Sequence, residues 1–209
     1  MIDDPTRHPN GEPVSTVVID DPRRLPPFDE IFGNTNPVEV EIGCGKAKFL
    51  LARANELPQI NFFGIDIVWK WMKYAVRRSE KRGLANIKFL RADARETIRH
   101  GFAPGSVSIF HVYFPDPWPK RKHRKHRLIK GEFLRLLHDR LTDNGLIELA
   151  TDHTDYYLQM EKAAIQSGIA WRQVRKLSDE RLFEAMAKTN YEIKYEAAGR
   201  KLHYLEIQK

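Results

Sequence analysis

The chain has 209 residues, of which 42% are hydrophobic and 30% charged, enough for a real core beneath an ordinary hydrophilic surface. Its formal net charge of +7 favours an acidic partner, and nucleic acid is the commonest one. A single cysteine excludes an internal disulfide and a multi-cysteine metal site, and no stretch reaches the roughly 18 apolar residues of a membrane helix. With no apolar signal segment at the polar start, we expect a cytoplasmic chain without membrane contact.

The first 36 residues differ in composition from the rest. Six of the 12 prolines fall within the first 27 residues, interleaved with aspartates and arginines. This composition predicts an extended, poorly packed N-terminal segment over residues 1–36. We expect a single domain over residues 37–209.

From residue 37 onward, short apolar runs alternate with helical patterns. The runs at 38–43, 61–66, 87–93, 107–114 and 145–152 predict buried strands, and 171–177 and 201–208 predict two more. Helices are expected at 46–56, 68–83, 95–100, 131–141 and 154–168, with a polar helical insertion before the last strand. Alternation on this scale predicts an α/β fold with a doubly wound, mostly parallel seven-stranded sheet. The late pair of strands fits a Rossmann-like methyltransferase better than a six-stranded dinucleotide domain.

An acidic residue stands near the end of each of the first five predicted strands. These residues are Glu41, Asp66, Asp93, Asp116 and Asp152. A single acid at a strand end is as often a helix cap or a turn residue as a functional group. Because open parallel sheets bind ligands beyond the carboxyl ends of their strands, five acids at one edge predict a binding site.

The glycines after the first strand allow a tight turn close to a ligand. Gly43 and Gly45 are followed by Lys48, where a dinucleotide fingerprint would have a third glycine. Asp66 follows at the interval typical of a ribose-binding acid. The pattern therefore favours S-adenosylmethionine, which has a ribose but no pyrophosphate, over a nicotinamide cofactor.

Two further residues could suggest chemistry, but a structural interpretation fits them better. Cys44 is expected to be a small residue packed in a tight turn rather than a nucleophile. His111 lies inside an apolar strand and is expected to be a hydrogen-bonded core histidine. The other histidines lack metal-ligand spacing, so we expect no metal.

The most informative segment is the sequence Phe-Pro-Asp-Pro-Trp that ends the fourth predicted strand. Pro115 and Pro117 fix the backbone around Asp116, and a rigid carboxylate can orient a planar ligand. Trp118 adds a stacking surface. Six cations without an acid follow directly, and without them the net charge would be only +1: Lys120, Arg121, Lys122, Arg124, Lys125 and Arg127. Basic runs are usually solvated, but this combination predicts contact with nucleic acid.

In order along the chain, these motifs resemble the bacterial tRNA (guanine-N7-)-methyltransferases. The similarity rests on residues 41–45, 64–66, 114–118, the basic run, 150–152 and 189–192, and it covers the chain from about Val38. The Pro-Asp-Pro-Trp segment with its basic run is the specific part, since many methyltransferases share the glycine loop.

The resemblance implies a class I S-adenosylmethionine-dependent enzyme that methylates guanine N7 in the variable loop of tRNA. It implies a cofactor site lined by Glu41, Gly43, Gly45, Asp66, Asp93 and Asp116. The target nucleotide would be contacted by Lys120, Asp152, Thr189, Asn190, Tyr191 and Glu192. RNA would be bound by Lys122, His123, Arg124, Lys125, His126 and Arg127. As partners we expect tRNA and no obligatory protein, with the chain a monomer or homodimer.

Three positions depart from the family pattern. Ala47 stands where the family loop often has glycine, and Tyr191 replaces a common phenylalanine but keeps the ring. The basic run has a histidine where arginine is common, so part of its phosphate affinity would depend on pH. No carboxylate is lost.

Guanine N7 carries a free lone pair, so its methylation needs no general base. We expect Asp116, as the catalytic residue, to accept hydrogen bonds from the guanine and to stabilise the developing cation. Asp152 and Glu192 would help to select guanine over adenine. Two alternatives stay open: methylation of an exocyclic base amine or a small molecule, and an RNA-binding module with a vestigial cofactor site.

Overall fold

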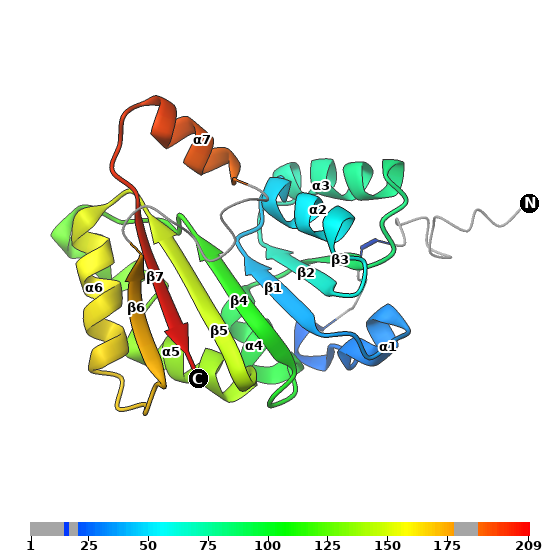
Figure 1. Cartoon of the computed structure of the whole chain (residues 1–209), viewed down its shortest axis with the longest axis horizontal. Coiled ribbons are helices and arrows are strands. Elements are labelled where there is room, and N and C mark those ends of the chain that lie inside the picture. Colours follow the sequence, from blue (N-terminus) through cyan, green and yellow to red (C-terminus); the bar gives the residue numbers. More distant parts are fainter. Residues whose placement is uncertain (1–14, 17–20, 178–187) are drawn as a thin grey trace, which may run out of the picture. The chain divides into compact units, whose positions relative to one another are not determined.

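The computed structural model describes residues 15–16, 21–177 and 188–209. The chain forms two compact units, unit 1 (Met1–Phe102) and unit 2 (Ala103–Lys209). Each has its own strands and covering helices (Figure 1).

Unit 1 is built on three parallel strands. In chain order its elements are the 3₁₀ helix η1 (Pro22–Arg24), α1 (Phe28–Phe32), β1 (Val38–Ile42), α2 (Lys48–Glu56), β2 (Asn61–Asp66), α3 (Trp69–Lys81), β3 (Ile87–Arg91) and α4 (Ala94–Gly101). β2 lies between β3 and β1 and pairs in parallel with both. The carboxyl ends of the three strands therefore lie at one edge.

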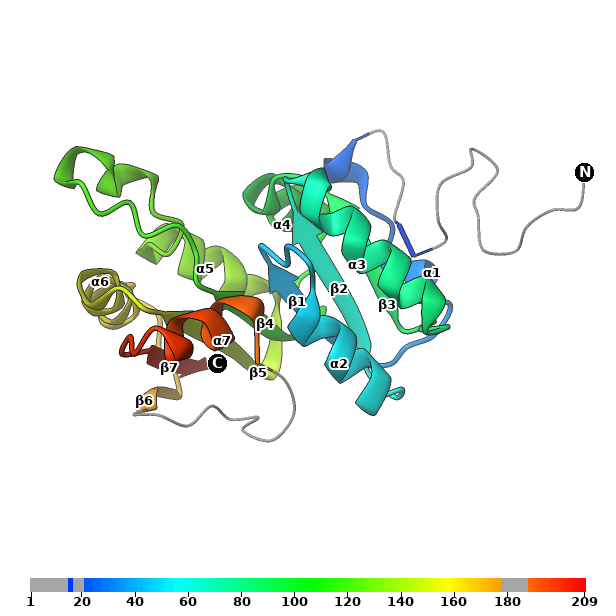
Figure 2. The ribbon, with the colours of Figure 1, turned by 90° about the horizontal axis from the view of Figure 1, so that it is seen from above.

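Side chains along β2 alternate between the two faces of the sheet, and both faces are covered. The Phe63 ring packs against Phe28 of α1 and against Phe102, with ring centroids 5.3 and 6.0 Å apart. The Phe62 ring lies on the opposite face, 5.8 Å from the guanidinium carbon of Arg53 in α2. α3 lies beside α2 (Figure 2) and buries Met72 and three neighbours on its inner stripe. This coverage explains why the residues of β1 and β2 are almost continuously buried, including Glu39 and Glu41 of β1.

Part of the N-terminal segment is helical rather than extended. η1 and α1 lie within residues 22–32, and Leu25 and Phe28 are buried. The proline content predicted an extended segment, but Pro22 lies at the first position of a 3₁₀ helix, where proline is well tolerated. Residues 1–14 and 17–20 lie outside the described residues, and the expected boundary near residue 37 stays a prediction.

Unit 2 contains four strands in the order β4-β5-β7-β6. In chain order its elements are β4 (Val107–Tyr113), the 3₁₀ helix η2 (Arg121–His126), α5 (Gly131–Arg140), β5 (Leu141–Thr151), α6 (Thr154–Ile165), β6 (Gln173–Leu177), α7 (Asn190–Ala197) and β7 (His203–Gln208). β4 and β5 are parallel, and β7 is antiparallel to both of its neighbours. The late antiparallel pair expected from the sequence is therefore present.

Most predicted elements lie within a few residues of the observed ones, and the differences are local. β5 begins at Leu141, directly after α5, rather than at residue 145. The basic run, for which no element was expected, forms η2. Of the polar insertion expected between β6 and β7, α7 is helical as predicted, whereas residues 178–187 are not described.

Candidate functional site at the strand ends

In unit 1, the loop after β1 is held in a conformation that favours glycine. Gly43 and Gly45 have φ angles of 76° and 52°. The amides of Gly43 and Cys44 donate to the Ile65 carbonyl at 2.8 and 3.2 Å, which fixes the loop to β2. A Cβ added at either glycine would meet nothing within 4 Å, so the loop backbone faces open space. A ligand can therefore approach this backbone closely.

Asp66 connects the glycine loop to the end of β2. Its Oδ2 accepts from the Gly45 amide at 2.8 Å, and its Oδ1 accepts from the Val68 amide at 2.7 Å. Each carboxylate oxygen still has acceptor capacity after one such bond. Asp66 can thus shape the loop and also accept a hydrogen bond from a ligand hydroxyl.

Glu41 and Asp93 lie on either side of Asp66 at the same edge. Glu41 is buried within β1, whose partner strand β2 ends at Asp66. Asp93 caps α4 by accepting from the amides of Arg95 and Glu96 at 2.8 and 3.3 Å, and its side chain is exposed. Unit 1 therefore brings together all the acids that the sequence placed on its three strands.

Cys44 has the structural role expected of it. Its thiol is buried against Gly64, where an added Cβ would lie only 2.9 Å from the sulfur. Burial raises the pKa of Cys44 well above its ordinary value, and the nearby charges of Glu41 and Asp66 raise it further. A thiol held protonated in this way is a poor nucleophile.

This edge of unit 1 fits an S-adenosyl group chemically. Carboxylates at Glu41, Asp66 and Asp93 are acceptors for the amine and hydroxyl hydrogens of the ligand. The open backbone at Gly43 and Gly45 leaves room for the amino-acid tail. The donors and acceptors present therefore match the cofactor predicted from the sequence.

In unit 2, the loop that follows β4 is strained at both ends. Phe114 and Trp118 have φ angles of 52° and 41° and flank the two prolines. Besides these two, Ala47 in the loop after β1 is the non-glycine residue with a positive φ in the described part of the chain. Such strain concentrates at functional sites. Asp116 lies between Pro115 and Pro117 with its side chain exposed.

Three aromatic rings gather beside this loop. Phe114 contacts Tyr191 and Tyr195 of α7, with ring centroids 6.1 and 5.5 Å apart, and the two tyrosine rings are 5.8 Å apart. Tyr191 is 52% exposed, so its ring remains available to a ligand. The cluster therefore offers a stacking surface for a planar base.

Asp152, at the end of β5, is held by an arginine that the sequence did not indicate. Arg200 Nη1 donates to Asp152 Oδ2 at 2.5 Å, and its guanidinium carbon lies 4.8 Å from the centroid of the Tyr195 ring. Burial raises the pKa of Tyr195, and the Asp152 charge adds to this effect. Arg200 thus connects Asp152 to the aromatic cluster.

The motif from Thr189 to Glu192 forms the start of α7 as a capping box. Thr189 Oγ1 accepts from the Glu192 amide at 3.0 Å, and Glu192 Oε2 accepts from the Thr189 amide at 2.7 Å. Tyr204 also donates to Glu192 Oε1 at 3.0 Å, and Glu192 is only 1% exposed. Thr189 and Glu192 therefore fix α7, whereas Asn190 and Tyr191 present exposed side chains.

The basic run forms an exposed 3₁₀ helix. Lys120 precedes it, and its cations Arg121, Lys122, Arg124 and Lys125 are all exposed. His126 is exposed and His123 half-buried, and their rings lie 5.2 and 5.9 Å from the Trp118 ring. A row of accessible cations beside an indole suits contact with a nucleic acid.

The prediction that Arg127 binds RNA is corrected by its burial. Its side chain is fully buried, with the guanidinium 4.7 Å from the Tyr156 ring centroid. It donates to the Pro117 carbonyl at 2.7 Å, to Gln159 Oε1 at 2.7 Å and to Asp155 Oδ2 at 2.6 Å. Arg127 therefore ties the Asp116 loop to α6 and is unavailable to a phosphate. The apolar pair Leu128-Ile129 that follows is the sequence signal that could have indicated this burial.

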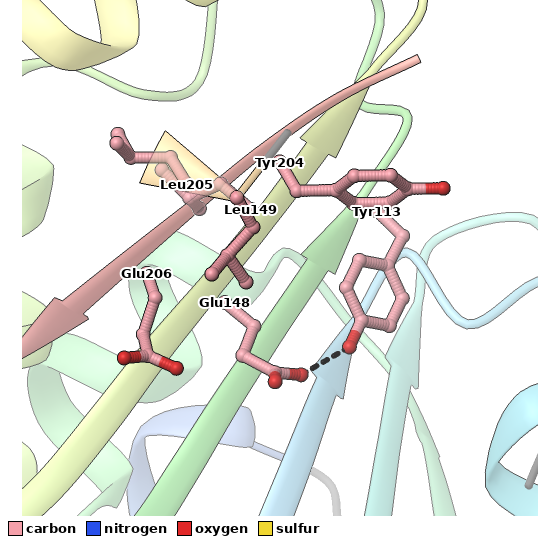
Figure 3. A pocket seen from close by; sticks show the side chains of 7 residues that line it. Tyr113, Glu148, Leu149, Tyr204, Leu205 and Glu206 are labelled. Atoms are coloured by element: carbon pink, nitrogen blue, oxygen red, sulfur yellow. Dashed lines mark hydrogen bonds between the residues drawn. The ribbon is translucent and has the colours of Figure 1, made fainter. Parts of the chain in front are cut away.

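His111 belongs to a buried polar network in unit 2 rather than to the strand-end site. Its Nδ1 lies 2.9 Å from Glu148 Oε2, which also accepts from the Tyr113 hydroxyl (Figure 3). Glu206 is the cross-strand neighbour of Glu148, and burial raises its pKa although Arg175 opposes the shift. The expectation of a hydrogen-bonded core histidine is confirmed.

The chain is similar to known methyltransferases over most of its length. A family described as putative methyltransferase matches residues 35–205. The tRNA (guanine-N(7)-)-methyltransferase of Streptococcus suis is 35% identical over 179 residues, which cover 86% of this chain and 84% of that protein.

Solved structures share the fold at low sequence identity. An antibiotic-related methyltransferase has a TM-score of 0.61 at 20% identity and covers 92% of this chain and 96% of its own. The 16S rRNA methyltransferase KamB has a TM-score of 0.62 at 16% identity and covers 87% and 91%. The predicted fold class, a doubly wound and mostly parallel methyltransferase sheet of seven strands, is confirmed. None of the helices in the described part of the chain has the length and apolar character to cross a bilayer.

Proposed function

Because the chain belongs to the tRNA (guanine-N7-)-methyltransferase family, we propose that it transfers the methyl group of S-adenosylmethionine to N7 of a guanine in tRNA. We further propose the variable loop as the place of that guanine, and a cytoplasmic location, in line with the resemblance of the motifs. The observation that carries the proposal is the set of groups at the end of β4. The exposed Asp116 lies there between two prolines, and the Phe114 ring contacts the exposed Tyr191.

The chemistry asks for positioning rather than for proton transfer. When bound, S-adenosylmethionine would supply an electrophilic methyl group to the N7 lone pair, and the electron pair of the carbon–sulfur bond would remain on sulfur. The purine gains a positive charge and no proton moves. Residues that hold the base in line and stabilise that charge therefore supply the catalysis.

On unit 2, Asp116 accepts hydrogen bonds from the donor edge of guanine and stabilises the positive charge. Asp152, held by Arg200, selects guanine through its acceptor oxygens. Tyr191 and Phe114 stack against the base, and Asn190 contacts it. Thr189 and Glu192 act by fixing α7, because both are buried in its capping box.

Cofactor and RNA are bound by two other groups of residues. The cofactor is held on unit 1 by Glu41, Gly43, Gly45, Asp66 and Asp93. The RNA backbone is bound by the accessible side chains of η2, which are Lys122, His123, Arg124, Lys125 and His126. Lys120, which precedes η2, contacts the target nucleotide. Their charges neutralise phosphates whatever the sequence.

Nucleoside analysis tests this proposal. Unmodified tRNA is incubated with the protein and methyl-labelled S-adenosylmethionine, and the tRNA is then digested to nucleosides. The expected product is labelled N7-methylguanosine. Label in a nucleoside methylated on an exocyclic amine would favour that alternative. A chain that binds tRNA but shows no cofactor binding by calorimetry would be an RNA-binding module.

A further inference from the structure

The outer face of α3 carries large apolar side chains that the packing of the helix does not need. Trp71 and Tyr74 are each 40% exposed, and both lie away from the buried stripe of Met72, Ala75 and Val76. That stripe already supplies the contact of α3 with unit 1. Two exposed aromatic rings three residues apart on one helix face therefore call for another explanation.

Lysines surround both rings. Lys46 Nζ, from the glycine loop, lies 4.9 Å from the centroid of the Trp71 ring and 5.7 Å from that of Tyr74. Lys70 Nζ lies 5.2 Å from the Trp71 ring, and Lys73 Nζ lies 5.6 Å from the Tyr74 ring. Between Trp69 and Lys81 the helix has five cations and one acid, Glu80. We call these two rings and three lysines the α3 aromatic face.

We propose that the α3 aromatic face is a second docking surface for tRNA, where unpaired bases stack on Trp71 and Tyr74 and the lysines neutralise the adjacent phosphates. This inference rests on the proposed function, because it takes tRNA as the substrate. Interleaved rings and cations match single-stranded nucleic acid, which offers flat bases and a charge at every nucleotide. Nothing in the family motifs marks this face.

The same features disfavour the other occupants. An apolar protein partner would take the three lysines out of water without supplying opposite charges. A membrane surface would need a broad uninterrupted apolar face, whereas the exposed lysines Lys70 and Lys73 lie among the exposed apolar side chains here: Ile67, Val68, Trp71 and Tyr74. Charge complementarity therefore favours RNA.

The test compares a double variant of the face with a matched control. Trp71→Ala/Tyr74→Ala removes both rings. Leu158→Ala/Ile165→Ala removes two large side chains on α6 that are 55% and 67% exposed. For the first variant, the Kd for unmodified tRNA and the KM for tRNA should rise about 10-fold to 100-fold. The control should match the parent protein, and the Kd for S-adenosylmethionine should be unchanged in both.

Ultraviolet cross-linking of the parent protein to tRNA gives a second measurement. Mass spectrometry should find a nucleotide adduct on the peptide that contains Trp71 and Tyr74. The docking surface would be overturned by a tRNA Kd equal to that of the parent, or by a loss of cofactor affinity, which would assign the face to the cofactor site. A parent dimer that dissociates in the first variant would also overturn it. A failure of the proposed function gives a different result: the parent protein would bind tRNA but would not methylate it.

Discussion

The strand ends of unit 1 and unit 2 are built by different means. In unit 1, carboxylates accept hydrogen bonds from backbone amides, as Asp66 does from Gly45 and Val68. In unit 2, side chains contact side chains far along the sequence, as Arg200 contacts Asp152 and Arg127 contacts Asp155. The first kind of edge shapes a loop around a cofactor, whereas the second holds a base-binding surface together. Substitutions at the unit 1 edge should therefore reduce cofactor binding, whereas substitutions at the unit 2 edge should reduce turnover or the stability of unit 2.

The largest effect is expected at Asp116. Asp116→Asn keeps the size of the side chain but removes its charge and half of its acceptor capacity, so turnover should fall about 100-fold or more. The Kd for tRNA should change little, because phosphate contacts dominate it. Raising the pH should give no rescue, since no proton leaves N7.

Single-turnover kinetics measure this effect. Asp143→Asn, at another exposed aspartate of unit 2, is the matched control and should behave as the parent. Near-normal turnover of Asp116→Asn would remove Asp116 from the mechanism and leave Asp152 as the group that holds the base.

The next effect concerns the stability of unit 2. Arg127→Met leaves the Pro117 carbonyl and Asp155 without the guanidinium, so the free energy of unfolding should fall by about 2–3 kcal/mol. Arg124→Met is the matched control, because Arg124 also pairs with Asp155, at 3.1 Å, but is exposed. It should cost less than about 1 kcal/mol. Equal losses in urea unfolding would show that burial of Arg127 contributes nothing.

The same pair predicts an acid dependence. The hydrogen bond from Arg127 lowers the pKa of Asp155 below its ordinary value of 3.8. A lowered folded-state pKa stabilises the protein above the unfolded-state pKa, and this contribution disappears as the pH falls through the folded-state pKa. Between pH 5 and pH 2, Arg127→Met should therefore lose less stability than the parent. Parallel curves would contradict the coupling.

At the other edge, Asp66→Ala should weaken S-adenosylmethionine binding by about 1–3 kcal/mol, because ribose hydroxyls lose their acceptor and the glycine loop loses its anchor. Asp66→Asn keeps one acceptor oxygen, so its affinity for S-adenosylmethionine in calorimetry should lie between that of Asp66→Ala and that of the parent. The Kd for tRNA should stay near that of the parent. Unchanged cofactor affinity would mean that the ribose binds elsewhere.

The basic run should affect the affinity for tRNA and its salt dependence, but not cofactor binding. Replacing Lys122, Arg124 and Lys125 with alanine should flatten the plot of log K against log salt by about 2 units, at roughly 0.7 per phosphate contact. Arg127→Met should leave this slope unchanged, because its guanidinium is buried. A slope unaffected by the triple variant would assign RNA binding to other cations.

The smallest effect is expected at Ala47. Its φ of 46° favours glycine, so relief of backbone strain in Ala47→Gly should stabilise the protein. The loss of a buried methyl group opposes this gain, and the net increase in the free energy of unfolding should be about 0.5 kcal/mol. Thermal unfolding measures the change. A large decrease would show that methyl packing outweighs the backbone strain.

The unit 1 edge could be predicted from the sequence because its signals are local. Buried strands, two glycines and an acid at or near the end of each strand determine where Glu41, Asp66 and Asp93 lie. The same reasoning placed Asp116 and Asp152 at strand ends.

The contacts of Arg127 and Arg200 could not be predicted in this way. The apolar pair Leu128-Ile129 signals that Arg127 is buried, but the sequence does not indicate which groups its guanidinium contacts, because these lie 10 to 32 residues away along the chain. Tyr195 was missed because its ring contacts depend on how α7 packs within unit 2. The capping-box role of Glu192 is local, and the spacing Thr189-x-x-Glu192 is the sequence signal that could have indicated it.

The central claim, attack by N7 without a base, is tested most directly by changing one atom of the substrate. The target guanosine of the tRNA is replaced by 7-deazaguanosine, which has a carbon–hydrogen group in place of N7. We predict that this tRNA binds with the Kd of the unmodified one and competes with it, but accepts no methyl group. Methyl transfer to the 7-deazaguanosine tRNA at the normal rate would contradict the account, because another atom would then be the acceptor.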